Sequence, residues 1–338
     1  MSRELITRTA APITHSRRSR RRRRVTAVLA TGAIAVGTAV SLGSGPASAA
    51  PFCAGGGAPG RLVGTVGGAA LEGLTVDGSG RAYTTDLISG QVFRLDAPGA
   101  RAVPIARVPA GGAGGLAWSP DGTLLVGYGA DPRVVVGDVV RPGGIARLNT
   151  RTNVLSPWVG GLSAADGMDV AANGTVYATN DFGTLIGRVA PNGAVSPAWG
   201  ALPSANGAVL GRGDGWLYVS RTFVNPGVTR ISTANPRVQQ SLLTLSGGDL
   251  TAAPDGLTLD SANRPIVPFN AAGKIVRLTS PGAYCVLAQG LPLSSVLSYG
   301  RGDRGFAKGH LYRAGFDGRI YEIPGGFDPR AVAAFPGN

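Results

Sequence analysis

Four oxygen-bearing side chains stand in the same local context at distant points of the chain. Each is followed by a glycine and an apolar residue, and they are Glu72, Asp166, Asn206 and Asp255. If these side chains meet, the three carboxylates repel one another, and the repulsion either raises their pKa values or is neutralised by a cation. An all-oxygen ligand set suits a hard cation such as Ca²⁺, whereas Zn²⁺ more often binds His or Cys. The pattern predicts one divalent metal ion, with Ca²⁺ favoured over Mg²⁺, Mn²⁺ or Zn²⁺.

Tight turns are the alternative interpretation of the same residues. Pairs such as Asp166-Gly167 suit turns because a short polar side chain caps its own backbone and glycine tolerates unusual dihedrals. Glu72 lacks this advantage, yet it occupies the same register as the Asp and Asn residues. We therefore interpret the four positions as one ligand set.

Repeated short strands must position these side chains. The first unit contains three apolar or alternating runs bounded by Gly, Asp or Ser, at residues 71–77, 80–86 and 90–96, and such runs are typical of strands. Equivalent runs occur six times, at intervals of 39 to 52 residues, and the units open at Glu72, Gly114, Asp166, Asn206, Asp255 and Ser294. A fourth strand fits the intervals, for example at 102–108, 154–159 and 238–245.

Four strands in a repeat of this length are typical of a propeller blade. A helical solenoid needs apolar residues spaced by 3.6 and few glycines, and this chain has 54 Gly and 24 Pro. We predict an all-β fold, a six-bladed β-propeller with four-stranded blades around a central channel. The first strand of each blade is innermost, so the six opening residues should ring one end of the channel. An apolar run at 62–66 should complete the last blade and remove the exposed sheet edges.

The first 49 residues have the layout of an export signal. Arginines 17, 18 and 20–24 precede an apolar stretch at 25–42, and Ala47-Ser48-Ala49 matches a cleavage site. A membrane span is the alternative, but the stretch is rich in Ala, Gly and Thr, and a span needs about 20 strongly apolar residues. We expect an export signal at 1–49, a linker at 50–60 and the propeller at 61–338. The protein would be secreted, or held in the cell envelope, by a bacterium that uses Sec or twin-arginine export.

Charge and cysteine content limit the partners. The formal charge is +13, but residues 1–49 carry nine Arg and one Glu, so the remainder carries only +5. Basic residues in that remainder are scattered, which argues against nucleic acid. We expect a monomer that binds a small molecule and has no stable membrane span after signal removal.

Cys53 and Cys285 are the two cysteines, and export favours a disulfide between them.

The blade starts resemble those of the senescence-marker-protein, gluconolactonase and regucalcin family of six-bladed lactone hydrolases. The resemblance covers roughly residues 60–330, and its most specific feature is the order Glu, Asx, Asn, Asp on blades one, three, four and five. It implies that Glu72, Asn206 and Asp255 are metal ligands, that Asp255 is also the general acid/base, and that Asp166 contacts substrate. Two positions depart from the family: Asp166 replaces the usual Asn, and Ala164 stands where some members have a substrate-binding Arg.

Three functions follow from this pattern. The first is a secreted metal-dependent hydrolase of a small lactone, similar to a gluconolactonase, with its metal on the propeller axis. The second is a non-enzymatic extracellular propeller that serves as a binding or scaffold protein. The third is a lyase or condensing propeller of the streptogramin-lyase or strictosidine-synthase type. His310 is the only histidine after residue 49, which argues against sites built on several histidines.

The insertion at 131–142 is either a lid over the channel or an ordinary long loop.

Overall fold

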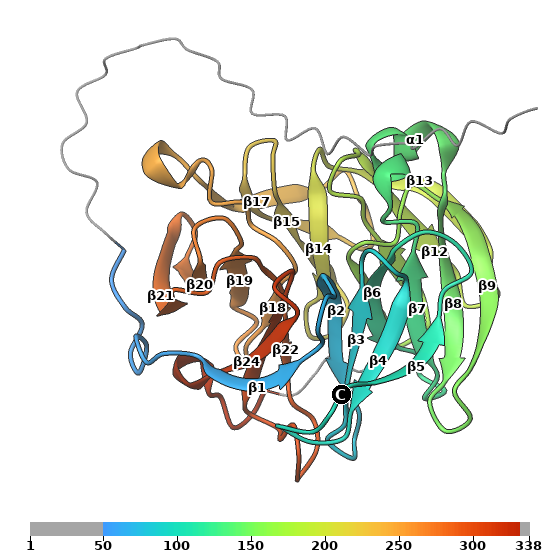
Figure 1. Ribbon diagram of the computed structural model, residues 1–338. Helices are drawn as coiled ribbons and strands as arrows, with labels where there is room; N and C mark the ends of the chain where they lie inside the picture. Colours follow the sequence, from blue (N-terminus) through green and yellow to red (C-terminus); the bar gives the residue numbers. More distant parts are fainter. Residues whose placement is uncertain (1–49, 332–338) are drawn as a thin grey trace, which may run out of the picture. The chain divides into compact units, whose positions relative to one another are not determined.

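The structure, a computed structural model, describes residues 50–331 (Figure 1). Within these residues the chain forms six antiparallel sheets of four strands each. The blades follow one another in chain order, and the innermost strands of neighbouring blades contact one another. The predicted all-β, six-bladed β-propeller is confirmed. The predicted signal at 1–49 lies outside the described residues.

The strands have the following bounds. Blade one contains β2 (Leu71–Val76), β3 (Ala82–Asp86), β4 (Gln91–Leu95) and β5 (Val103–Arg107). Blade two contains β6 (Ala113–Trp118), β7 (Leu124–Tyr128), β8 (Gly143–Asn149) and β9 (Val154–Leu162), and blade three contains β10 (Met168–Val170), β11 (Val176–Ala178), β12 (Leu185–Val189) and β13 (Val195–Ala201). Blade four contains β14 (Ala205–Leu210), β15 (Trp216–Arg221), β16 (Gly227–Ser232) and β17 (Gln239–Thr244). Blade five contains β18 (Thr258–Leu259), β19 (Pro265–Phe269), β20 (Lys274–Ser280) and β21 (Ala283–Gln289). Blade six contains β22 (Ser294–Tyr299), β23 (Leu311–Gly315), β24 (Arg319–Ile323) and β1 (Arg61–Thr65).

Short helices lie between some strands. The insertion of blade two forms a 3-10 helix, η1 (Pro132–Val136), and one turn of α-helix, α1 (Gly137–Val140). Two further 3-10 helices are η2 (Gly247–Asp249) and η3 (Pro324–Gly326). Among the helices within residues 50–331, none has the length and apolar character needed to cross a membrane.

Blade six is built from both ends of the described chain. The early strand β1 pairs antiparallel with β24, and the sheet runs β1-β24-β23-β22. This pairing closes the ring, as the apolar run before the first repeat predicts. Closure covers the sheet edges that an open ring would expose to other chains.

A disulfide attaches the segment before β1 to blade five. Cys53 is bonded to Cys285 of β21, which lies 232 residues later. The backbone supports the same contact, because the Cys53 amide donates a hydrogen bond to the Val286 carbonyl at 2.9 Å. The expected pairing of the two cysteines is therefore present, and it adds a covalent link beside the β1–β24 closure.

Hydrophobic contacts between neighbouring blades form the core. Six clusters of buried side chains occur in the described residues, and each joins two adjacent blades. Between blades one and two, Tyr83 packs edge-on against Trp118 with ring centroids 5.7 Å apart. The Trp118 indole also donates to the Thr75 hydroxyl at 3.1 Å, so its polar atom is satisfied inside the core.

The glycines that follow the four candidate residues allow close packing of the inner strands. A Cβ on Gly167 would lie 2.2 Å from the Asn206 carbonyl oxygen, and one on Gly207 would lie 2.6 Å from the Gly256 Cα. Neither glycine has a positive φ. Close approach of neighbouring blades, and not a tight turn, therefore requires glycine at these two positions.

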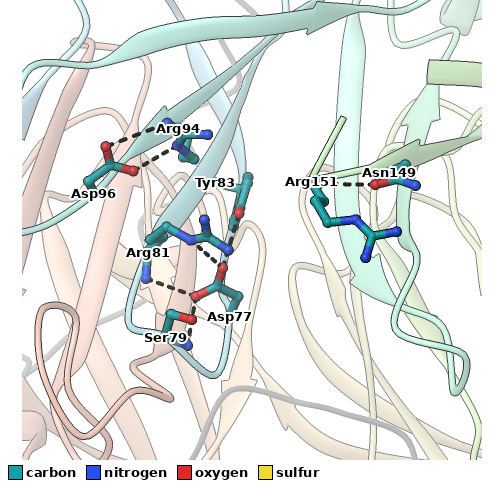
Figure 2. A network of polar contacts seen from close by, with 8 residues as sticks. All are labelled: Asp77, Ser79, Arg81, Tyr83, Arg94, Asp96, Asn149 and Arg151. Carbon is teal, nitrogen blue, oxygen red and sulfur yellow. Dashed lines mark hydrogen bonds and ion pairs between the residues drawn. The ribbon is translucent and has the colours of Figure 1, made fainter. Parts of the chain in front are cut away.

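The hairpin turns at the opposite end of the propeller use acidic residues differently. Strand β2 runs from the Glu72 end towards Asp77, whose carboxylate closes the following turn (Figure 2). It accepts hydrogen bonds from the backbone amides of Ser79 at 2.9 Å and Arg81 at 3.0 Å, and from Arg81 Nε at 2.7 Å. Asp77 thus has a structural role and is neutralised by a local arginine.

The disulfide should contribute substantially to stability. Replacing both cysteines, Cys53→Ser with Cys285→Ser, should lower the free energy of unfolding by about 3 to 5 kcal/mol, because the bond restricts a very long loop in the unfolded chain. Denaturant titration of the two proteins measures the difference. As a control, the denatured, unreduced wild type should show no titratable thiol. Two free thiols, or equal stabilities, would contradict this role.

Candidate functional site

The structure places the four candidate residues at one end of the central channel. Glu72 and Asn206 are the second residues of β2 and β14, and Asp166 and Asp255 lie just before β10 and β18. All four side chains are buried and line a common cavity of about 320 Å³. The equivalent positions of blades two and six, Gly114 and Ser294, are not among the residues that line it. The sequence pattern thus identified four side chains that the fold brings together.

Asp181 is a fourth carboxylate of this cavity, beside those of Glu72, Asp166 and Asp255. It lies in the loop between β11 and β12 of blade three and lines the same cavity. Its register differs from that of the blade starts, so the repeat did not mark it. Its pKa is raised well above the usual value by burial and by the charges of Asp166 and Asp255.

The cavity holds negative charge without basic neighbours. No Arg, Lys or His is among the described residues that line it. Burial, and then the charges of Asp166, Asp255 and Asp181, hold the pKa of Glu72 well above its usual value. Burial raises the pKa of Asp166 to about 7. A cavity of this kind favours either bound protons or a bound cation.

Asp255 is held in one orientation by two donors. Its Oδ1 accepts the Gly256 amide at 2.9 Å, and its Oδ2 accepts Asn270 Nδ2 at 2.9 Å. These hydrogen bonds lower the pKa of Asp255, but burial and the charge of Asp166 outweigh them and raise it to about 7. The carboxylate is therefore fixed in place, although its charge is only partly compensated.

The amide of Asn206 is oriented so that its oxygen has no donor. Asn206 Nδ2 donates to Thr222 Oγ1 at 2.9 Å, and the Thr222 hydroxyl donates onward to the Pro254 carbonyl at 2.7 Å. This relay sets the flip of the amide, and Asn206 Oδ1 is left buried without a hydrogen-bond partner. Buried carbonyl oxygens are rarely left unsatisfied, and a cation among the neighbouring carboxylates would satisfy this one.

The carboxylates do not all converge on one point. Within residues 50–331, no group of three or more His, Cys, Asp or Glu side chains is arranged as a metal site. A cation here would therefore depend on an amide oxygen beside at most two carboxylates. The set Glu72, Asn206 and Asp255 has this composition, and its donor chemistry fits a hard divalent ion.

The insertion of blade two reaches the edge of the cavity. Val134 of η1 lines the cavity, and Asp138 of α1 ties the insertion to blade three. The Asp138 carboxylate accepts the Ser163 hydroxyl at 2.6 Å and the Thr184 amide at 2.7 Å. The segment therefore contributes to the wall of the site.

His310 lies outside the cavity. It precedes β23, and its Nδ1 is 2.9 Å from Glu322 Oε1 on β24. Arg61 also bonds to Glu322, so the histidine belongs to a polar cluster of blade six around the buried Glu322 carboxylate. The one histidine of the described residues is therefore not part of the candidate site.

Solved structures share this architecture at low sequence identity. A gluconolactonase from Xanthomonas campestris matches with a TM-score of 0.61 and 15% identity, covering 79% of this chain and 94% of that protein. Regucalcin from Agrobacterium tumefaciens, described as a calcium-binding protein, matches with a TM-score of 0.61 and 17% identity, covering 81% and 94%. Virginiamycin B lyase from Staphylococcus aureus matches with a TM-score of 0.52 and 16% identity, covering 78% and 88%.

These likenesses establish the propeller fold. No protein-family model and no curated protein sequence matches the chain. Gluconolactonase and regucalcin structures are among its structural neighbours, as the resemblance of the blade starts implies.

The buried carboxylates should make the metal-free protein less stable as pH rises. The pKa values of Asp166 and Asp255 are about 7 in the folded chain and about 3.9 in an unfolded one, so the folded state binds more protons between these values. The melting temperature of chelator-treated protein should therefore fall by about 5 °C between pH 5 and pH 8. The measurement is thermal unfolding followed by circular dichroism.

Two controls accompany this measurement. Asp166→Asn should reduce the fall, because it removes one of the titrating groups, and Ca²⁺ added at pH 8 should restore the melting temperature. A melting temperature that is flat or rises over this pH range would contradict the electrostatic account of the cavity.

Proposed function

We propose that the protein is a secreted, metal-dependent hydrolase of a small lactone. The observation that carries this proposal is the buried, unpartnered oxygen of Asn206 beside carboxylates that have no basic neighbour. Glu72, Asn206 and Asp255 would hold one divalent cation, with Ca²⁺ favoured. Structural likeness to a gluconolactonase supports this activity, and likeness to regucalcin, described as a calcium-binding protein, supports the cation. The Cys53–Cys285 disulfide is compatible with an oxidising compartment outside the cell.

Hydrolysis of a lactone adds one water molecule across the ring ester. The water oxygen attacks the carbonyl carbon, the ring C–O bond breaks, and the leaving oxygen takes up a proton to give a hydroxy acid. A divalent cation bound at this site would polarise the lactone carbonyl. The remaining work, which is to orient the substrate and to move one proton, falls to side chains of the cavity.

Asp255 is the candidate for moving that proton. The Gly256 amide and the Asn270 amide each donate to one of its oxygens, and Asp255 lines the cavity. It would accept the proton from the attacking water and return it to the leaving oxygen. Asp166 lines the same cavity and would contact the substrate.

Lyase chemistry is less well supported. A structural neighbour is a variant of virginiamycin B lyase in which a histidine is replaced by alanine, and it is described as catalytically inactive. In this chain His310 is paired with Glu322 and does not line the cavity. A histidine-dependent reaction therefore has no candidate residue at this site.

Asp255→Asn tests the proposed proton transfer. The change keeps the volume and an oxygen ligand but removes the charge and the basic site, so the fold should survive while kcat on the best lactone falls by roughly 10² or more. Asp166→Asn is the matched variant, and it should change KM more than kcat. The assay uses aldonolactones and aliphatic lactones with Ca²⁺, Mg²⁺, Mn²⁺ and Zn²⁺ added in turn. Equal background rates for wild type and Asp255→Asn throughout would favour the non-enzymatic binding propeller.

A further inference from the structure

The wall above the carboxylates is apolar. Leu87, Val134, Phe182, Phe223 and Phe316 line the cavity together with the polar residues of its floor. Each of the five comes from a loop that joins the second and third strands of a blade. Since second strands run towards the Glu72 end, these loops gather around one mouth. A substrate that enters from this side passes the apolar mouth before it reaches the floor.

Two phenylalanines form the most prominent feature of the mouth. The rings of Phe182 and Phe223, from blades three and four, have centroids 5.0 Å apart at an angle of 38°. Their exposed fractions are 51% and 55%, although both line the cavity. Exposed aromatic surface at the mouth of a pocket gains free energy when an apolar ligand covers it.

Further apolar side chains extend this surface. The insertion of blade two exposes Val135, Val136, Val139 and Val140, and Val224 follows Phe223 in the loop of blade four. The insertion is held beside blade three by Asp138 and by Asn180, whose Nδ2 donates to the Val134 carbonyl at 3.0 Å. The mouth is therefore an anchored apolar rim.

The cavity is rich in hydrogen-bond acceptors and poor in donors. Thr222 is used to orient Asn206, and Asn270 donates to Asp255. No Arg, Lys or His of the described residues lines the cavity. Ala164, at the position of a substrate-binding Arg in some relatives of the resembled family, is buried with 1% of its surface exposed. Sugar hydroxyls would find acceptors on the carboxylate floor but few donors, and they would gain nothing from the apolar wall, so the apolar wall carries the preference.

We propose that the substrate is a lactone carrying an alkyl or aryl substituent, and not an aldonolactone. This inference rests on the proposed lactonase function. The ester group would lie on the carboxylate floor, and the substituent would pack against Phe182 and Phe223. A cavity of about 320 Å³ is at the lower end of the range for ligand pockets, so one ring with a short substituent fits it.

Paired substrates test the proposal. The value of kcat/KM for γ-nonalactone and for dihydrocoumarin should exceed that for D-glucono-δ-lactone by about tenfold or more, the factor that corresponds to about 1.4 kcal/mol. Phe182→Ser and Phe223→Ser should each lower the value for γ-nonalactone about tenfold and lower that for D-glucono-δ-lactone less, so that the ratio of the two values falls. Phe52→Ser is the matched control, because Phe52 is also 51% exposed and does not line the cavity.

A binding measurement separates this proposal from the proposed reaction. Calorimetry with 6-butylpiperidin-2-one, an alkyl lactam that resists hydrolysis, should show binding with a negative heat-capacity change, and Phe182→Ser should weaken it. If no lactone is hydrolysed but the lactam binds in this way, the proposed hydrolysis is wrong, while the proposed class of apolar ring ligands is supported. If lactones are hydrolysed with the aldonolactone preferred, the ligand class is wrong and the reaction stands. Absence of both hydrolysis and lactam binding would overturn both.

Discussion

The close approach of the innermost strands is the constraint on which the rest of the structure depends. A Cβ on Gly73 would lie 2.6 Å from the Gly114 carbonyl oxygen, and a Cβ on Gly114 would lie 2.4 Å from the Ala165 carbonyl oxygen. Neighbouring blades therefore meet backbone to backbone near the axis, while their larger apolar side chains pack farther out. The pairing of β1 with β24 closes the ring at the outer edge of blade six.

This narrow axis determines the chemistry of the site. Side chains that open the inner strands have little room and are removed from water, so Glu72, Asp166 and Asp255 have raised pKa values and no basic partner among the residues lining the cavity. At the other end, Asp77 lies in a hairpin turn where Arg81 reaches it. An aspartate thus has a structural role at one end of the propeller, where an arginine compensates its charge, whereas at the other end no basic residue lining the cavity compensates the charge of the carboxylates. Burying such charge costs free energy that the hydrophobic contacts between blades must offset.

Much of the fold could be predicted because the propeller repeats a local pattern. Short apolar runs and their spacing identified the blades, the closing strand and the four residues at Glu72, Asp166, Asn206 and Asp255. Asp181, Phe182 and Phe223 could not be found this way, because they lie in loops without periodicity. Their meeting depends on the position of each loop around the closed ring. The free oxygen of Asn206 was equally beyond prediction, since it depends on the hydrogen bond to Thr222.

The account depends most on a cation at the floor of the cavity. Equilibrium dialysis at pH 7.5, followed by elemental analysis, measures it directly in wild type and in Asn206→Ala, which removes the unpartnered oxygen. The account predicts one divalent ion for each chain of the wild type and weaker binding by the folded variant. Wild-type protein that takes up none of Ca²⁺, Mg²⁺, Mn²⁺ or Zn²⁺, or a variant that binds as tightly as wild type, would contradict it.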